Sequence, residues 1–128
     1  TQAKTLFPYT TLFRSGKAEL GEQLAKQMDA EVKDLVAEGA RKAQGGDYEG
    51  AVQFMLSAVR KMPGNVHVLF NATLALLKYI ENCGWNERFA TQARDLMERA
   101  RQLDPGNSRL PALTAFYYNL LKKYGIQP

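Results

Sequence analysis

Histidine and cysteine, the side chains that most often act as metal ligands or nucleophiles, are scarce in this chain. Its 128 residues include one histidine, His67, and one cysteine, Cys83. A structural zinc site takes about four protein ligands, and a cysteine nucleophile needs a histidine placed to remove its proton. One residue of each kind supports neither arrangement, so the sequence predicts no metal site and no cofactor. We expect His67 to lie on the surface or in a groove.

Carboxylates are scattered along polar stretches. Glu31, Asp34 and Glu38 follow one another at helical spacing, as do Asp95 and Glu98. Solvated helix surface explains this pattern better than general acid–base catalysis, which requires a pair of groups converging on a substrate. We therefore expect that the chain is not an enzyme.

A pair of alanines seven residues apart, followed five residues later by Pro-Gly-Asn, occurs twice with a constant offset of 42 residues. A period of this size is typical of stacked helical units. Alanines at fixed positions let neighbouring helix axes approach closely, and stacks of this kind usually bind other proteins. The matched positions are Ala51 with Ala93, Ala58 with Ala100, and Pro63-Gly64-Asn65 with Pro105-Gly106-Asn107.

Apolar periodicity and capping residues predict five helices. Between residues 17 and 44 apolar side chains recur every three or four positions, which indicates one long helix or two nearly collinear ones. Asp47, Asn65 and Asn86 are placed to cap the helices that follow them. Pro111 is compatible with the last helix only in its first turn, where backbone amides lack helical partners. The expected helices are 17–44, 48–61, 66–81, 87–103 and 108–123.

Two runs resemble the second helix and exit turn of a tetratricopeptide repeat. They are GDYEGAVQFMLSAVRKMPGN, ending at Asn65, and ARDLMERARQLDPGN, ending at Asn107; Gly39 stands at the small position of the preceding first helix. The resemblance implies an all-α, right-handed α-α superhelix with units 32–65 and 66–107 and a C-terminal capping helix within 108–125. Because the offset exceeds the family's usual period of about 34 residues, we expect the excess in a loop around 81–88.

The resemblance also implies a binding site, because the first helices of such units line a concave groove for a peptide or a partner helix. The amide of Asn71 can bond the backbone of an extended ligand or, equally well, a neighbouring helix. Trp85 either packs on the core, which we favour, or anchors a partner. The groove positions carried over are Lys33, Val36, Ala40, His67, Phe70, Asn71, Leu74, Lys78, Arg109, Ala112 and Phe116.

A narrower resemblance concerns the C-terminal half. The stretch LFNATLALLKYIENCGWNERFATQARDLMERARQLDPGN and the ending LLKKYG are similar to the C-terminal helical region of bacterial response regulators that carry tetratricopeptide repeats. This implies a cytoplasmic two-component signalling protein whose output region binds other proteins. A single cysteine also suits a reducing compartment.

Residues 5–15, TLFPYTTLFRS, resemble one reading frame of a synthetic sequencing adapter. We therefore treat 1–15 as a non-native segment and 16–128 as the helical domain. If the response-regulator resemblance holds, the adapter replaced an upstream part of a longer protein, and a receiver domain is one candidate for that part.

Charge and hydropathy narrow the partner classes. The chain has 17 basic and 13 acidic residues; without 1–15, which hold Lys4 and Arg14, 15 basic and 13 acidic residues remain, a net charge of +2. RNA binding through a basic groove is therefore disfavoured. The longest apolar run, 68–77, is far below the roughly 20 residues that span a membrane.

A rival to partner binding is self-association through C-terminal apolar surface that one stack leaves uncovered. The residues concerned are Phe116, Tyr117, Tyr118, Leu120 and Leu121.

Overall fold

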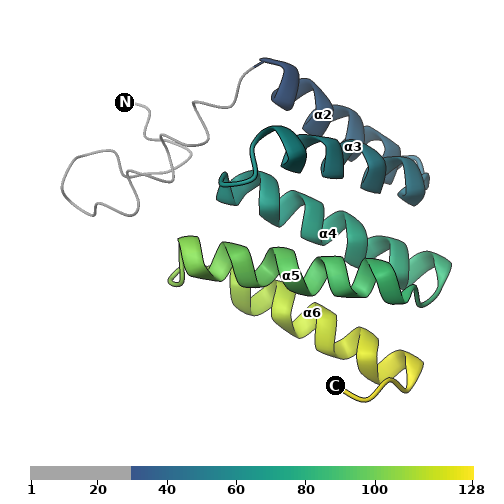
Figure 1. The fold of residues 1–128 in the computed structure, drawn as a ribbon. Helices are drawn as coiled ribbons and strands as arrows, with labels where there is room; N and C mark the ends of the chain where they lie inside the picture. Colours follow the sequence, from purple (N-terminus) through teal and green to yellow (C-terminus); the bar gives the residue numbers. More distant parts are fainter. Residues whose placement is uncertain (1–29) are drawn as a thin grey trace.

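The structure is a computed structural model, and it describes residues 30–128. Within this range the chain is all-α, with five helices and no strand, as the sequence predicts. The helices stack side by side in chain order, from α2 at one end to α6 at the other (Figure 1). The right-handed sense of the superhelix stays a prediction. The helices are α2 (Ala30–Gln44), α3 (Tyr48–Lys61), α4 (Val66–Cys83), α5 (Glu87–Leu103) and α6 (Arg109–Tyr124).

The first part of the chain lies outside the described residues. This applies to the adapter-like segment 1–15 and to the expected start of the first helix, from residue 17 onward. The later part of that helix is present as α2, which ends at Gln44, before the glycine pair Gly45-Gly46.

Three helices begin at the capping residues that the sequence predicts. The side chain of Asp47 accepts a hydrogen bond of 2.9 Å from the amide of Gly50. Asn65 and Asn86 accept equivalent bonds, of 3.2 Å and 3.0 Å, from the amides three residues later. Each bond gives a partner to an amide that the helix itself leaves unpaired.

The last helix begins differently. Ser108 precedes α6 and forms no side-chain capping bond. Instead, Asn107 accepts a hydrogen bond of 2.9 Å from the amide of Arg109. Pro111 lies in the first turn of α6, where its missing amide costs no helical hydrogen bond, as expected.

The connection between α4 and α5 corrects one prediction. No loop occupies 81–88: α4 continues to Cys83, and α5 starts at Glu87, after three residues. The connection is short because both helices are long: α4 has 18 residues and α5 has 17, where α3 in the preceding hairpin has 14. Gly84 permits the abrupt turn because its φ of 110° is a conformation that other residues rarely adopt.

Small residues lie where the helices approach most closely. The four repeated alanines are fully buried. At Gly39 an added Cβ would stand 3.0 Å from Cε of Met55, so α2 and α3 approach closely there and a larger residue would have to displace the Met55 side chain. Pro63 and Pro105 lie exposed in the turns that follow α3 and α5. The alanines are Ala51, Ala58, Ala93 and Ala100.

The central helix is α4, which packs against all four other helices. Its side chains are buried on several sides, with Leu69, Leu76 and Ile80 all fully enclosed. This confirms the expectation, from its continuous apolar sequence, that α4 is buried on more than one face. The last helix, α6, packs more extensively against α4 than against α5, the helix that precedes it in the chain.

Candidate functional site

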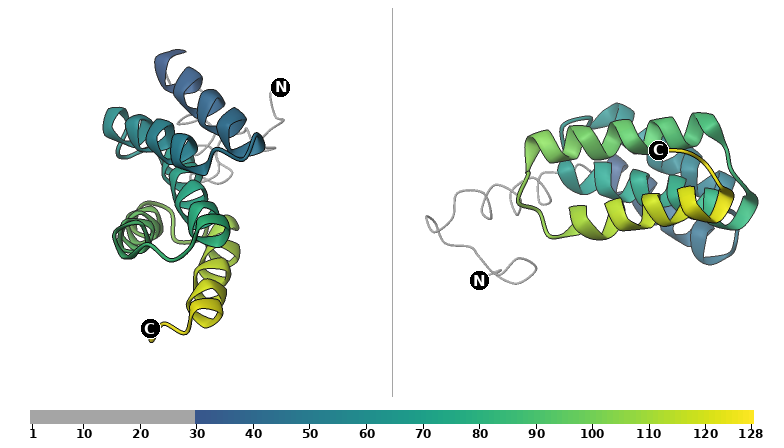
Figure 2. Two further views of the ribbon diagram at one scale, coloured as in Figure 1. Left: turned by 90° about the vertical axis from the view of Figure 1, so that its right-hand side faces the viewer. Right: turned by 90° about the horizontal axis from the view of Figure 1, so that it is seen from below.

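The face formed by α2, α4 and α6 carries the positions implied by the repeat resemblance. Helix α4 lies between α2 and α6 and contacts both. The left view of Figure 2 shows α3 and α5 on the opposite side of the stack. On α4 the predicted residues form one helical stripe, because residues three and four apart lie on the same face. This stripe consists of His67, Asn71, Leu74 and Lys78.

At one end of the stripe, α6 contributes a cation. The guanidinium of Arg109 lies over the ring of Phe70, 5.1 Å from its centroid. Burial lowers the pKa of Arg109. Burial, and secondly the positive charge of Arg109, also hold the pKa of His67 below its ordinary value of 6.5. His67 of α4 and Arg109 of α6 are therefore two neighbouring basic groups that are both partly shielded from water.

Phe70 needs a correction. It was expected to line the groove, but only 1 % of it is exposed. Its ring lies beneath Arg109 and belongs to the core, because this side of α4 turns inward toward α6. Phe70 thus supports the guanidinium and does not offer its own surface to a ligand.

Arg109 has no counter-ion in the described part of the chain. Its guanidinium forms no hydrogen bond and no ion pair with residues 30–128. Its one aromatic contact in that range is with the ring of Phe70. The backbone amide of Arg109 bonds Asn107, but that bond does not neutralise the side chain. A half-buried cation is costly without a partner, and the contact with an aromatic face offsets only part of that cost.

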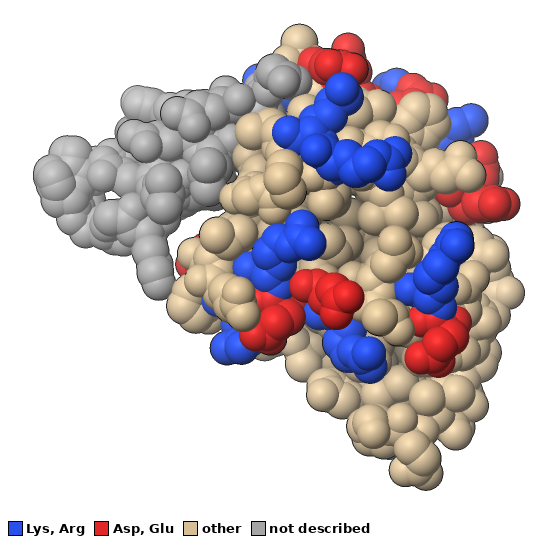
Figure 3. Space-filling model, viewed as in Figure 1, with Lys and Arg blue, Asp and Glu red and all other residues tan. Residues whose placement is uncertain are grey.

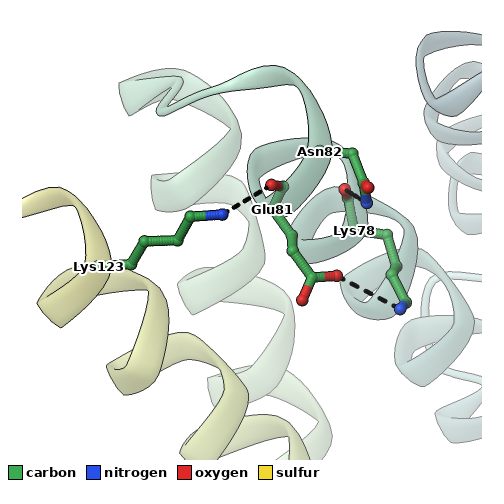
Figure 4. Close-up of polar contacts among 4 residues, drawn as sticks. All are labelled: Lys78, Glu81, Asn82 and Lys123. Carbon is green, nitrogen blue, oxygen red and sulfur yellow. Dashed lines mark hydrogen bonds and ion pairs between the residues drawn. The ribbon is translucent and has the colours of Figure 1, made fainter.

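The other end of the stripe is held by paired groups. The ammonium of Lys78 lies 5.8 Å from the ring centroid of Phe116 and 3.3 Å from the carboxylate of Glu81. Figure 4 shows this ion pair, together with the bond of 3.1 Å that Lys123 donates to the backbone carbonyl of Glu81. Asn82 donates a bond of 2.9 Å to the carbonyl of Lys78. Lys78 therefore has an acidic partner, unlike Arg109.

Asn71 does not bond a neighbouring helix. Its amide nitrogen donates a hydrogen bond of 3.0 Å to the carbonyl of His67, within α4. The interhelical alternative is therefore wrong. The bond occupies one donor and leaves the side-chain oxygen as an acceptor with no partner among residues 30–128.

The residues expected from α2 take no part in the polar and ring contacts of this arrangement among residues 30–128. Lys33 and Ala40 are exposed and Val36 is half-buried. No hydrogen bond, ion pair or ring contact joins Lys33 or Val36 to the stripe on α4 within the described residues. The polar and ring contacts of the candidate site therefore come from α4 and α6, while Val36 of α2 packs against the core.

Trp85 packs against the core, as favoured from the sequence. It is half-buried in the short α4–α5 connection. Its ring lies 6.1 Å from that of Tyr124, and its indole nitrogen donates a bond of 3.0 Å to Glu87. The ring therefore closes the end of the stack where α4, α5 and α6 meet.

The apolar C-terminal surface expected for self-association is mostly absent. Tyr117, Leu120 and Leu121 are 5 %, 3 % and 4 % exposed, because α6 turns them toward the core. Phe116 is half-buried and Tyr118, at 52 %, is the exposed member of the set. A single aromatic residue is not a surface that requires a second copy to cover it.

Two surface hollows were not anticipated from the sequence. One, of about 470 Å³, lies between α5 and α6 and includes Arg94, Glu98 and Tyr117. The other, of about 240 Å³, lies between α3 and α5 and includes Gln92, whose side-chain oxygen is buried without a partner among the described residues. Both depend on how the packed helices tilt against one another, which the local sequence pattern does not indicate.

Charges of both signs are distributed over the surface. On the face shown in Figure 3, Lys and Arg side chains lie among Asp and Glu side chains instead of forming a continuous basic stripe. No helix among residues 30–128 combines the length and apolar content needed to cross a membrane. In the same range, His, Cys, Asp and Glu do not gather in threes at metal-binding distance.

Comparisons with known proteins found no match: no protein-family model, curated protein or solved structure corresponds to this chain.

Proposed function

We propose that this chain is a protein–protein interaction module that binds a peptide or a partner helix along α4, between α2 and α6. One observation carries the proposal: a stripe of accessible polar and apolar side chains on the central helix is flanked by Arg109 and Phe116 of α6. The stripe combines an amide oxygen without a partner, the apolar Leu74 and basic groups at both ends. Apolar surface with a few placed polar groups is the usual composition of a recognition site.

The module acts by rigid display, and no bond is made or broken. Helix α4 is packed on several sides, and α6 is fixed to it at both ends, through Arg109 over Phe70 and Lys123 on Glu81. A site that is ordered before binding loses little conformational entropy when a ligand arrives, which favours affinity.

We further propose that the chain is a tetratricopeptide-type output region of a bacterial, cytoplasmic response regulator. The support is the resemblance of residues 69–107 and of the ending LLKKYG, together with the helical-hairpin order α2 to α6. Reading the genomic sequence upstream of the codon for Gly16 tests this. A receiver domain in frame supports it, and an unrelated open reading frame contradicts it.

Selection from a displayed library of random peptides tests the binding function. Peptides of about twelve residues suffice, since an extended chain of about 3.3 Å per residue then exceeds the length of α4. Selected peptides are measured against the whole chain and two stripe variants, Asn71→Ala and Lys78→Glu. We expect both to weaken binding by about tenfold, a typical effect of one well-placed contact.

Arg99→Glu provides the matched control. Arg99 is exposed on α5, on the opposite side of the stack, and has no ion-pair partner among residues 30–128. This charge reversal should leave binding unchanged. If the library yields no binder, the proposed function is wrong; if binders ignore both stripe variants, the site lies elsewhere, with Trp85 the next place to mutate.

A further inference from the structure

The 42-residue repeat makes α6 the counterpart of α4. The offset that relates Asn65 to Asn107 also pairs the positions that follow these two residues. Inward-facing positions agree, since both members of two such pairs are buried. Helix α6 therefore corresponds to α4, the first helix of its hairpin. The two pairs are Val68 with Leu110 and Ala75 with Tyr117.

Another face of α6 is exposed where α4 is covered. Five positions that are fully buried in α4 have exposed counterparts in α6, which we call the outer face of α6. Helix α5 packs on α4 more extensively than any other described helix, whereas α6 lies at the end of the stack, with no further helix of residues 30–128 beyond it (Figure 1). The pairs are Leu69 with Pro111, Ala72 with Thr114, Thr73 with Ala115, Leu76 with Tyr118 and Leu77 with Asn119.

The outer face carries no charge. Between Arg109 and Lys122 the sequence of α6 has no charged residue, whereas α5, a helix of similar length, has seven. The end helix of a stack needs a polar outer surface when it borders water. The centres of protein interfaces, by contrast, are depleted in charged residues and enriched in tyrosine. Tyr118, which is 52 % exposed, and its uncharged neighbours therefore have the composition of an interface.

The shape of this surface suits a helix. A hollow of about 470 Å³ between α5 and α6 is lined from α6 by Thr114 and Tyr118. Small residues let two helix axes approach closely, as Gly39 does where α2 meets Met55 of α3. Ala115 leaves similar room on α6. A helix on the outer face would thus continue the helix-on-helix packing that builds the stack.

Two cations border one end of the outer face. Arg94 of α5 has one polar contact in the described residues, a bond of 3.4 Å to the hydroxyl of Tyr117. Lys122, one turn after Tyr118, has no ion-pair partner among residues 30–128. Asp95 lines the hollow beside Arg94 and offsets one of these two charges. The surplus is positive, so this end of the outer face complements an acidic group.

A helix antiparallel to α6 begins at this end. In the hairpins α2–α3 and α4–α5 the second helix runs back along the first, and each second helix has a glutamate in its first turn. Acidic residues in a first turn also interact favourably with the helix dipole. A helix that starts with an acidic residue beside Arg94 and Lys122 meets both conditions. The two glutamates are Glu49 and Glu87.

A second copy of the chain does not offer such a helix among its described residues. Helix α6 contains no acidic residue, so two copies of α6 would meet without a partner for Lys122. Like charges brought together at an interface are unfavourable. Helices α3 and α5, which do begin with an acidic turn, are already packed in their own hairpins. The helix that fits the outer face therefore comes from another protein.

We propose that the outer face of α6 is a second interaction surface, separate from the groove along α4, and that it receives an amphipathic helix of a partner protein. The partner helix packs antiparallel to α6 and beside α5. It carries small side chains seven residues apart, as α3 and α5 do, where it crosses Ala115 and Tyr118. Its first turn is acidic and lies beside Arg94 and Lys122.

Libraries of displayed helical peptides test the proposal with the whole chain. Peptides of about 18 residues match the length of α6 at about 1.5 Å per residue. The first library fixes Glu in the first turn and Ala at two positions seven apart, the second replaces both Ala with Leu, and the third replaces Glu with Lys. We expect the first to be retained about tenfold more than the leucine library, because large side chains hold the helix away from Ala115. It should exceed the lysine library about threefold.

Variants of the chain assign the binding to its residues. Ala115→Gln, which keeps good helix propensity but fills the contact, should weaken selected helices about tenfold. Ala37→Gln is the matched control, since Ala37 is equally exposed but lies on α2, at the other end of the stack. Lys122→Glu should reverse the preference between the glutamate and lysine libraries. Circular dichroism and thermal melting show that each variant remains folded.

The outcomes separate this surface from the groove. Selected helices that bind Asn71→Ala normally and Ala115→Gln weakly support the proposal. Helices that lose binding in Asn71→Ala occupy the groove, which supports the proposed function and overturns this inference. The inference also fails if no library binds, if the alanine and leucine libraries bind equally, or if Lys122→Glu leaves the charge preference unchanged. A concentration-dependent dimer in sedimentation that Ala115→Gln dissociates would make a second copy the occupant and refute the partner helix.

Discussion

The phenol of Tyr124 donates a hydrogen bond of 2.8 Å to the backbone carbonyl of Ile80, joining the last turn of α6 to the last turn of α4. Next to it, the ammonium of Lys123 bonds the carbonyl of Glu81. The last carbonyls of a helix have no partner within that helix. Helix α6 therefore supplies donors to the end of α4, which explains why it packs more on α4 than on α5.

Removing the Tyr124 hydroxyl should loosen this connection. The Tyr124→Phe variant keeps the ring and its contact with Trp85 but loses the bond to Ile80. We expect the free energy of unfolding to fall by about 1 kcal/mol, the usual net contribution of one hydrogen bond. Urea titration measures it. The control Tyr118→Phe removes an exposed hydroxyl that has no hydrogen bond to residues 30–128, so stability should change by less than about 0.5 kcal/mol. Equal behaviour of the two variants would show that the bond does not hold α6.

The parts of the fold that the sequence predicts correctly depend on local signals. Asp47, Asn65 and Asn86 cap their helices because the bond from an Asp or Asn side chain spans only three residues. The loop expected at 81–88 was inferred from the repeat length, whereas α4 continues to Cys83 and ends at Gly84, whose φ is 110°. The bonds from α6 to the carbonyls of Ile80 and Glu81 join residues more than thirty positions apart and have no local signal in the sequence.

The capping residues lead to a second prediction. Replacing Asn86 with alanine removes the acceptor of the Phe89 amide and should lower the free energy of unfolding by about 1 kcal/mol. Ser108, the residue before α6, forms no side-chain capping bond, so Ser108→Ala should be close to neutral. Parallel thermal and urea denaturation compares the two. A loss in Ser108→Ala as large as in Asn86→Ala would contradict the observed start of α6.

Close packing of the hairpins gives a third prediction. Ala58 is fully buried, so the Ala58→Leu variant must force neighbouring helices apart. Inserting methylenes into a packed core costs about 1–3 kcal/mol. The same substitution at Ala115, which is exposed on α6, should cost far less. Urea midpoints of the two variants measure the difference. Unchanged stability in Ala58→Leu would mean that the interior has room that the structure does not show.

The candidate site was predictable in part, for a related reason. The α4 positions were carried over from the resemblance to a tetratricopeptide repeat, and His67, Asn71, Leu74 and Lys78 share one face because they are three or four residues apart. The burial of Phe70 and the position of Arg109 over it were not, because they depend on how α6 leans on α4. That no residue among 30–128 pairs with the Arg109 guanidinium is likewise a property of the folded neighbourhood and has no signal in the sequence.

His67 makes stability depend on pH in a definite direction. Burial, followed by the charge of Arg109, lowers the pKa of His67 in the folded chain. The unfolded chain, whose histidine has its ordinary pKa of about 6.5, therefore binds the proton more readily than the folded chain. Stability falls as the pH drops through that value, and the loss is complete once the pH lies below the folded pKa.

We expect the change in stability in this pH range to come from His67 alone. His67 is the only histidine, and the pKa values of Glu38 and Glu98 are lowered from 4.5, each by a hydrogen bond to a neighbouring arginine, so these carboxylates titrate at lower pH. We expect the urea midpoint of the native chain to decrease between about pH 7.5 and about pH 5.5. The His67→Gln variant, which cannot take up the proton, should decrease less. Parallel slopes for the two proteins would show that His67 is not desolvated beside Arg109.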